Sequence, residues 1–212
     1  MKNETQTKLP DWVWEFHGHR CPFMPIGYRM GVIALRELGI ERIRDHGAIA
    51  LSEMGVGHPQ GCMVDGVMSA TGCTYGKLMM ERLNYGKAAI ILYAPKKGAV
   101  RVYLKSDFQD LLGKEEFFAY RKRGIEPSDI PFEVAERAIK LVLNTAEDQM
   151  FKIEKLSEFS FSLPKGSFAK VKCSKCGEYV FERYIRSVDG KPVCIPCSGF
   201  TESRLDVLKG IQ

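Results

Sequence analysis

The order of apolar and polar positions predicts a chain that mixes helices with strands. In residues 24–40 apolar side chains recur at helical spacing, and Gly39 provides a stop signal. Residues 88–94 and 99–105 show two strongly apolar strand patterns, and the residues between them, which include Pro95 and Gly98, predict a hairpin. The apolar stripe of the first helix consists of Ile26, Met30, Ile33, Ala34 and Leu38.

The remaining segments carry weaker patterns. Residues 47–54 fit a short strand, and residues 61–83 fit short helices that break near Gly72. Two helical stretches follow at about 107–123 and 131–147, and Pro127 and Pro131 mark the break between them. Residues 151–168 form a connector that we expect to be partly a strand.

Length and charge indicate two units. A chain of 212 residues suits one medium domain and a small one, and we predict domains over residues 1–165 and 166–212. Residues 165–212 hold nine Lys and Arg against five Asp and Glu, which leaves 22 against 21 for residues 1–164. The basic excess therefore lies at the C-terminal end. The net charge of +5 permits an acidic partner but does not require one.

The sequence indicates a cytoplasmic protein. The sequence contains no stretch of about 18 uncharged apolar residues, which is the length needed to span a membrane. The N-terminal residues lack the apolar core of a signal peptide. Seven cysteines, four of them in two C-x-x-C pairs, indicate metal binding rather than a disulfide framework in such a protein.

The two C-x-x-C pairs predict a zinc site. Four thiolates at this spacing suit one tetrahedral Zn²⁺ and leave no open position for a substrate, so we expect a structural site. A hairpin with an Asp189-Gly190 turn is predicted between the pairs, and the second pair is expected to open a short helix that runs to about Lys209. This arrangement resembles a treble-clef zinc finger. The ligands are Cys173, Cys176, Cys194 and Cys197.

Two alternatives to zinc are a pair of disulfides and a redox pair. A unit this small has too little core to fold well without its metal, which favours zinc. The basic residues around the finger could meet nucleic acid, but they could equally form a solvated face or a surface for a protein, so the sequence does not favour a nucleic-acid partner. These residues are Lys170, Lys172, Lys175, Arg183 and Arg186.

A second candidate site lies in the segment FHGHRCPFMPIG, residues 16–27. In an extended chain His17, His19 and Cys21 would project to one side, because side chains two residues apart point the same way. Pro22 favours an extended Cys21, and Pro25 fits the first turn of the following helix. A helix N-terminus also lowers the pKa of a nearby cysteine. We therefore predict a transition-metal site here, with zinc or iron as the metal.

A fourth ligand must come from elsewhere in the chain. Cys62 and Cys73 are the candidates, and His58 is a weaker one; both cysteines could instead be small buried apolar residues. Asp65 would share a helix face with Cys62, where it could orient a histidine or act as a general base. We take Cys21, His19 and Asp65 as the candidate catalytic residues.

These residues also carry a family resemblance. The segments FHGHRCPFMPIGYRMG, GCMVDGVMSATGCTYGK and NYGKAAIILY resemble the FmdE family, which is named after formylmethanofuran dehydrogenase, over roughly residues 10–150. The resemblance implies an α+β fold with a mixed sheet flanked by helices, loosely thioredoxin-like, and some members carry a C-terminal treble-clef finger. It also implies a metal-binding active site at His17, His19, Cys21 and Cys62.

Three functions follow as hypotheses. The first is a metal-bearing subunit of a molybdenum or tungsten formylmethanofuran dehydrogenase-type oxidoreductase, although the chain lacks a pterin-binding motif and an iron–sulfur run. The second is a non-catalytic metal-handling protein that docks through its finger, and the third is a nucleic-acid-binding regulator. We expect a homodimer, and the aromatic residues Trp12, Trp14 and Phe16 form either its interface or part of the core. Dithiol exchange would require Cys62 or Cys73 to approach Cys21.

Overall fold

The computed structural model describes residues 9–161 and 167–200. The chain divides into two compact units, Met1–Phe161 and Ser162–Gln212, and each is described by itself. The predicted domain boundary between residues 165 and 166 lies outside the described residues. Among the described residues, no helix is both long and apolar enough to cross a bilayer.

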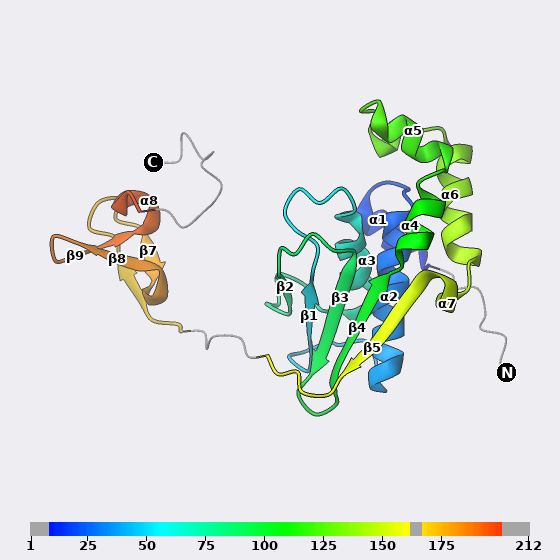
Figure 1. The fold of residues 1–212 in the computed structure, drawn as a ribbon. Helices are drawn as coiled ribbons and strands as arrows, with labels where there is room; N and C mark the ends of the chain where they lie inside the picture. Colours follow the sequence, from blue (N-terminus) through cyan, green and yellow to red (C-terminus); the bar gives the residue numbers. More distant parts are fainter. Residues whose placement is uncertain (1–8, 162–166, 201–212) are drawn as a thin grey trace. The chain divides into compact units, whose positions relative to one another are not determined.

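The first unit is built on a five-stranded mixed sheet with the order β2-β1-β3-β4-β5. Strands β1 and β2 are parallel, and the other neighbours are antiparallel (Figure 1). The predicted hairpin is confirmed, because Ala94 pairs with Gly98 at its turn. The strands are β1 (Ile49–Ser52), β2 (Met80–Arg82), β3 (Ala89–Ala94), β4 (Gly98–Leu104) and β5 (Phe151–Leu156).

Helices cover one face of this sheet. Residues at alternate positions of β3 and β4, such as Leu92 and Val102, join the residues of the long helix α2 (Phe23–Leu38) in the main core. The predicted apolar stripe of α2 is buried, and the helix ends at Gly39, which adopts a left-handed conformation with φ 61°. The other helical segments of this unit are α1 (Asp11–His17), α3 (Cys62–Thr71), α4 (Ser106–Leu112), α5 (Glu116–Lys122), η1 (Pro127–Asp129), α6 (Phe132–Asn144) and α7 (Glu147–Met150).

Helices α2 and α3 pack against each other at glycines. A Cβ atom on Gly27 would lie 1.9 Å from the carbonyl oxygen of Met63, and one on Gly66 would lie 2.3 Å from that of Met24. Further along, a Cβ on Gly31 would approach Ala70, so both helices run in the same direction and begin side by side. This close approach places Cys62, the first residue of α3, beside the N-terminal end of α2.

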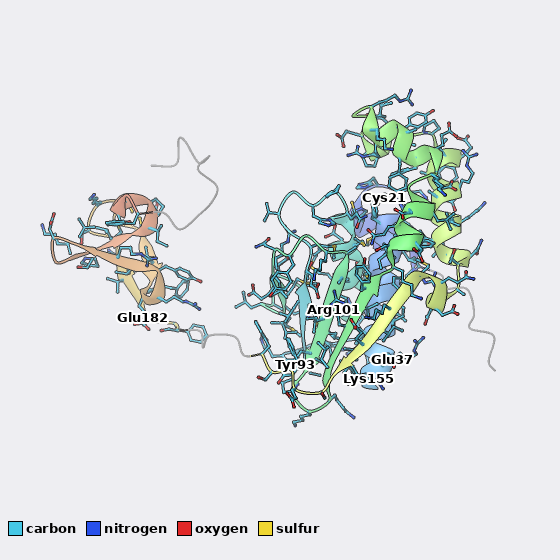
Figure 2. All side chains as sticks on the ribbon, in the orientation of Figure 1. Cys21, Glu37, Tyr93, Arg101, Lys155 and Glu182 are labelled. Atoms are coloured by element: carbon cyan, nitrogen blue, oxygen red, sulfur yellow. The ribbon has the colours of Figure 1, made fainter. Side chains whose placement is uncertain are left out.

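The opposite face of the sheet has a smaller apolar cluster, in which Leu51 and Ile91 are buried. Arg101 on β4 also lies on this face, opposite Ile91 (Figure 2). Its Nε donates to Glu53 Oε1 at 2.5 Å and its Nη1 donates to Glu154 Oε2 at 2.8 Å. The hydrogen bonds to Glu53 raise the pKa of Arg101 above its ordinary value. Glu53 is almost fully buried, so Arg101 is the partner that compensates its carboxylate.

We expect Arg101→Met to destabilise the first unit by about 3 kcal/mol, because it leaves the Glu53 carboxylate buried without its partner. Urea denaturation followed by circular dichroism measures this loss. The double variant Glu53→Met with Arg101→Met is the control, since replacing both members of a buried pair removes the uncompensated charge. A single variant as stable as the original protein would contradict a role for the pair in holding this face.

The second unit is small and built from two hairpins. Strands β6 (Lys170–Lys172) and β7 (Tyr179–Phe181) form one, and β8 (Ile185–Val188) and β9 (Lys191–Cys194) form the other. The predicted turn of the second hairpin is confirmed, with φ 50° at Asp189 and 72° at Gly190. A short 3₁₀ helix, η2 (Glu182–Tyr184), precedes β8, and α8 (Ile195–Ser198) follows β9.

Two of the predicted element assignments are wrong, and a third is confirmed only in part. Residues 80–82, expected in a short helix, form the edge strand β2, which pairs with β1. The helix expected over 107–123 is two helices, because α4 ends at Leu112 and α5 begins at Glu116. The second C-x-x-C pair does open a short helix, but that helix ends at Ser198, and its predicted continuation beyond residue 200 lies outside the described residues.

Candidate metal centre

The N-terminal candidate ligands lie where two helices meet. His17 is the last residue of α1, so the prediction that it belongs to an extended segment is wrong. Gly18 ends that helix in a left-handed conformation, φ 84°, which an L side chain rarely adopts. His19 and Cys21 follow this glycine, just before α2 begins at Phe23. Figure 2 shows Cys21 at the opposite end of α2 from Glu37.

The structure brings four donor atoms together. One ligand atom from each of His17, His19, Cys21 and Cys62 lies within 4.8 Å of all the others. The Nε2 atom of His17 is 3.6 Å from Cys21 Sγ, and the Nε2 atom of His19 is 3.8 Å from Cys62 Sγ. The packing of α2 on α3 therefore brings Cys62 to the other three as the fourth donor atom.

This donor set fits a transition metal. With zinc bonds of about 2.3 Å to sulfur and about 2.0 Å to nitrogen, nitrogen and sulfur ligands of a tetrahedral ion lie about 3.5 Å apart. The two measured nitrogen–sulfur separations are close to that value. Two imidazoles and two thiolates suit zinc or iron.

Asp65 completes the cluster through His17. The Nδ1 atom of His17 donates to Asp65 Oδ2 at 2.8 Å, which leaves Nε2 directed at the sulfur atoms. Burial lowers the pKa of His17, but the hydrogen bond to Asp65 and the proximity of Cys62 outweigh burial and raise it to about 9. Of the two roles predicted for Asp65, its geometry favours orienting a histidine.

The two thiols differ in their acidity. The hydrogen bond between Cys21 and Cys62, with help from His17, lowers the pKa of Cys62 to about 4. The same hydrogen bond and burial raise the pKa of Cys21 well above its ordinary value. Cys62 is therefore the thiolate of the pair, and a metal would displace the proton shared by the two sulfurs.

The other candidates lie elsewhere among the described residues. Cys73 is fully buried, and its thiol donates to the carbonyl of Ala48 at 3.8 Å, as expected of a small buried residue. His58 accepts a hydrogen bond from the backbone N–H of Gln60 at 3.2 Å and is not part of the cluster. His46 is exposed.

One residue of the site, Arg20, had no sequence signal. Its guanidinium lies 4.5 Å from the centroid of the Trp14 ring and 5.4 Å from that of Phe132, and its Nη2 donates to Glu136 at 2.7 Å. A cavity of about 360 Å³ adjoins it and is lined by His19, Arg20 and residues of the segment 127–135. His19 therefore borders both this cavity and the cluster.

The aromatic residues of α1 have separate environments. Trp14 packs against the main core, whereas Trp12 and Phe16 are 45% and 55% exposed. The interpretation of these three residues as core therefore holds for Trp14 alone, and the dimer interface stays a prediction.

The four C-terminal cysteines form the second cluster. One Sγ atom from each of Cys173, Cys176, Cys194 and Cys197 lies within 4.8 Å of the others. Backbone N–H groups of Cys176 and Cys194 lower the pKa of Cys173 to about 6, which favours a thiolate. Gly177, with φ 77°, makes the tight turn after the second ligand.

Comparison with known families assigns both units. Residues 16–152 match the family described as FmdE, molybdenum formylmethanofuran dehydrogenase operon. Residues 166–202 match the prokaryotic dksA/traR C4-type zinc finger, so the four-cysteine cluster is a zinc-finger site.

Two similar proteins extend this comparison. A probable S-adenosyl-L-methionine-binding protein of Archaeoglobus fulgidus is 30% identical over 197 residues, which are 87% of this chain and 51% of the relative. The chain thus spans about half the length of that relative. The crystal structure of a tungsten formylmethanofuran dehydrogenase FmdE-like protein from Syntrophus aciditrophicus superposes with a TM-score of 0.56 at 23% identity, covering 90% of each chain. This likeness confirms the α+β fold with its sheet flanked by helices.

Proposed function

Because the chain belongs to the FmdE family, we propose that it is a metal-bearing subunit or accessory protein of a molybdenum or tungsten formylmethanofuran dehydrogenase-type oxidoreductase. The observation that carries this function is the cluster of two histidines and two cysteines, with Asp65 bonded to one of the histidines. No other group of metal-binding side chains is found in the described part of the first unit.

The residues have distinct roles in this proposal. His17, His19, Cys21 and Cys62 would hold a zinc or iron ion, and Asp65 fixes the tautomer and orientation of His17. With four protein ligands, a bound ion would act as a Lewis acid towards an oxygen atom of a small ligand only by taking that oxygen as a fifth donor. His19 faces the cavity beside Arg20, so a ligand would approach from that side.

An auxiliary role suits the chain better than the complete dehydrogenase reaction. Its sequence has no pterin-binding motif and no iron–sulfur run. The S-adenosylmethionine binding named for the Archaeoglobus relative forms no part of the proposed function, because half of that relative lies outside the shared region. We place the protein in the cytoplasm, as a homodimer or within an oxidoreductase complex.

The second candidate function is metal handling without chemistry. His19 and Cys62 are only half-buried, and half-buried ligands allow an ion to be exchanged with a partner. Such a protein would deliver metal to a larger complex and dock through its finger. A stoichiometric partner recovered from native extract would favour this function, whereas turnover of a small substrate by the isolated protein would contradict it.

Elemental analysis of anaerobically purified protein, without added metal or chelator, tests the proposed metal site. We expect two metal ions per chain, one of them the zinc of the finger. A single zinc per chain would contradict a resident N-terminal metal. If two ions are found, the identity of the second element indicates the chemistry of the N-terminal site.

We expect Asp65→Asn to weaken binding of the N-terminal metal by about 10- to 100-fold, because a neutral amide oxygen orients the His17 ring less firmly than a carboxylate and lowers its basicity. Competition with a chromophoric chelator measures the affinity. Asp110→Asn, a change outside the cluster, is the control and should leave the affinity unchanged. Equal affinities for both variants would contradict the orienting role of Asp65.

A further inference from the structure

The β6–β7 hairpin of the finger exposes an unusual set of side chains. Lys170 pairs with Phe181 and Lys172 pairs with Tyr179, and directly opposed residues of an antiparallel pair share one face. The other face carries Val171 and Val180, and Val180 packs against the small core around the cysteines. We propose that the outer face, made of Lys170, Lys172, Tyr179 and Phe181, binds single-stranded nucleic acid.

The exposed aromatic rings are the first argument. Tyr179 is 61% exposed and Phe181 50%, and Phe168, two residues before β6, is 97% exposed. Tyr184 and Phe200 add two more exposed rings within the same small unit. Large apolar side chains gathered on a surface mark an interaction site, and flat rings stack on nucleobases without regard to sequence.

The lysines are the second argument. The Nζ atoms of Lys170 and Lys172 lie 4.6 Å and 5.3 Å from the centroid of the Tyr179 ring. Positive charges thus lie beside an aromatic ring. In proteins that bind single strands, such charges contact the phosphates while the bases of the strand stack on the rings. A protein interface would be expected to carry the aromatic residues but to be depleted in lysine.

The form of the finger favours a single strand over a duplex. In the described part of the finger, the helix after the second C-x-x-C pair is only the four residues of α8, too short to read a major groove. The hairpin instead offers an open two-stranded face, on which unpaired bases could lie. The basic residues alone did not favour a nucleic-acid partner in the sequence. The exposed aromatic rings are the additional observation that favours one.

Fluorescence anisotropy with the full-length, zinc-loaded protein tests this assignment. The probes are a labelled 12-nucleotide single-stranded RNA, the matching single-stranded DNA and the corresponding DNA duplex. We expect the single strands to bind more tightly than the duplex. Tyr179→Ala with Phe181→Ala should weaken their binding at least about tenfold, because two stacking surfaces are lost. Lys170→Ser with Lys172→Ser should make the negative slope of log K against log salt shallower by about 1.4.

Matched exposed residues of the first unit provide the controls. Tyr85 is 62% exposed, so Tyr85→Ala controls for loss of an exposed ring, and Lys96→Ser with Lys97→Ser controls for loss of two charges. All variants should keep their zinc, because none of these side chains is a ligand. Absence of binding at about 50 mM salt, or equal losses in the control variants, would overturn the proposal. Poly-glutamate binding as tightly as the single strands would assign the face to an acidic protein and would overturn it as well.

Discussion

Replacing Cys21 by serine should remove the N-terminal metal and leave the zinc of the finger in place. Metal content should therefore fall from two ions per chain to one. Cys21 Sγ faces the Nε2 atom of His17 at 3.6 Å, and the side chain is 1% exposed. A serine hydroxyl is a poor ligand for a soft transition metal, and water cannot easily take its place in so buried a position. The loss of affinity should exceed the roughly 100-fold limit expected for a residue that only orients a ligand.

Cys73→Ser is the matched control for this experiment. Cys73 is also a fully buried thiol of the first unit, but it lies outside the cluster. Its replacement should keep both metals, although it adds a buried hydroxyl near the carbonyl of Ala48. Elemental analysis of the two variants, purified side by side, distinguishes ligation from a general effect on folding. If Cys21→Ser kept two ions per chain at full affinity, Cys21 would not be a ligand.

Local spacing in the sequence could group only part of the site, and it was the family resemblance that pointed to Cys62. His17, His19 and Cys21 are close in the chain, so local spacing was enough to group them. Cys62 begins α3 and Cys73 lies two residues beyond its end, and no local pattern distinguishes one from the other. The choice depends on the direction of α3 against α2, which the contacts of Gly27 and Gly66 determine.

The fold shows the same division between local and distant information. The β3–β4 hairpin and helix α2 were predictable because their patterns are local and strong. Strand β2 was missed because its three residues, Met80–Arg82, become a strand only by pairing with β1, about 30 residues earlier in the chain. The helix that ends at His17 was missed because it is short and Val13 is its one fully buried residue, which gives too weak an apolar pattern to show a helical period.

Gly66→Ala should be among the most damaging single substitutions in the first unit. In an exposed helix, replacing glycine by alanine usually stabilises by about 1 kcal/mol. Here the new Cβ would lie 2.3 Å from the carbonyl oxygen of Met24 and 2.5 Å from the backbone nitrogen of Tyr28. Both neighbours are backbone atoms of α2 and cannot rotate away, so the helices must separate. We expect a loss of about 3 kcal/mol or more in the free energy of unfolding.

The same separation should damage the metal centre, which Gly66 does not touch. Because Cys62 begins α3 and Cys21 precedes α2, moving the helices apart moves the two thiols apart. Urea denaturation measures the stability, and elemental analysis of the folded fraction measures the metal. Gly76→Ala is the control, since a Cβ there meets no atom within 4 Å and the residue has no positive φ. Equal stability of the two variants would mean that the glycine contacts do not set the helix spacing. Loss of the metal in Gly66→Ala but not in Gly76→Ala would show that the site depends on the spacing of α2 and α3.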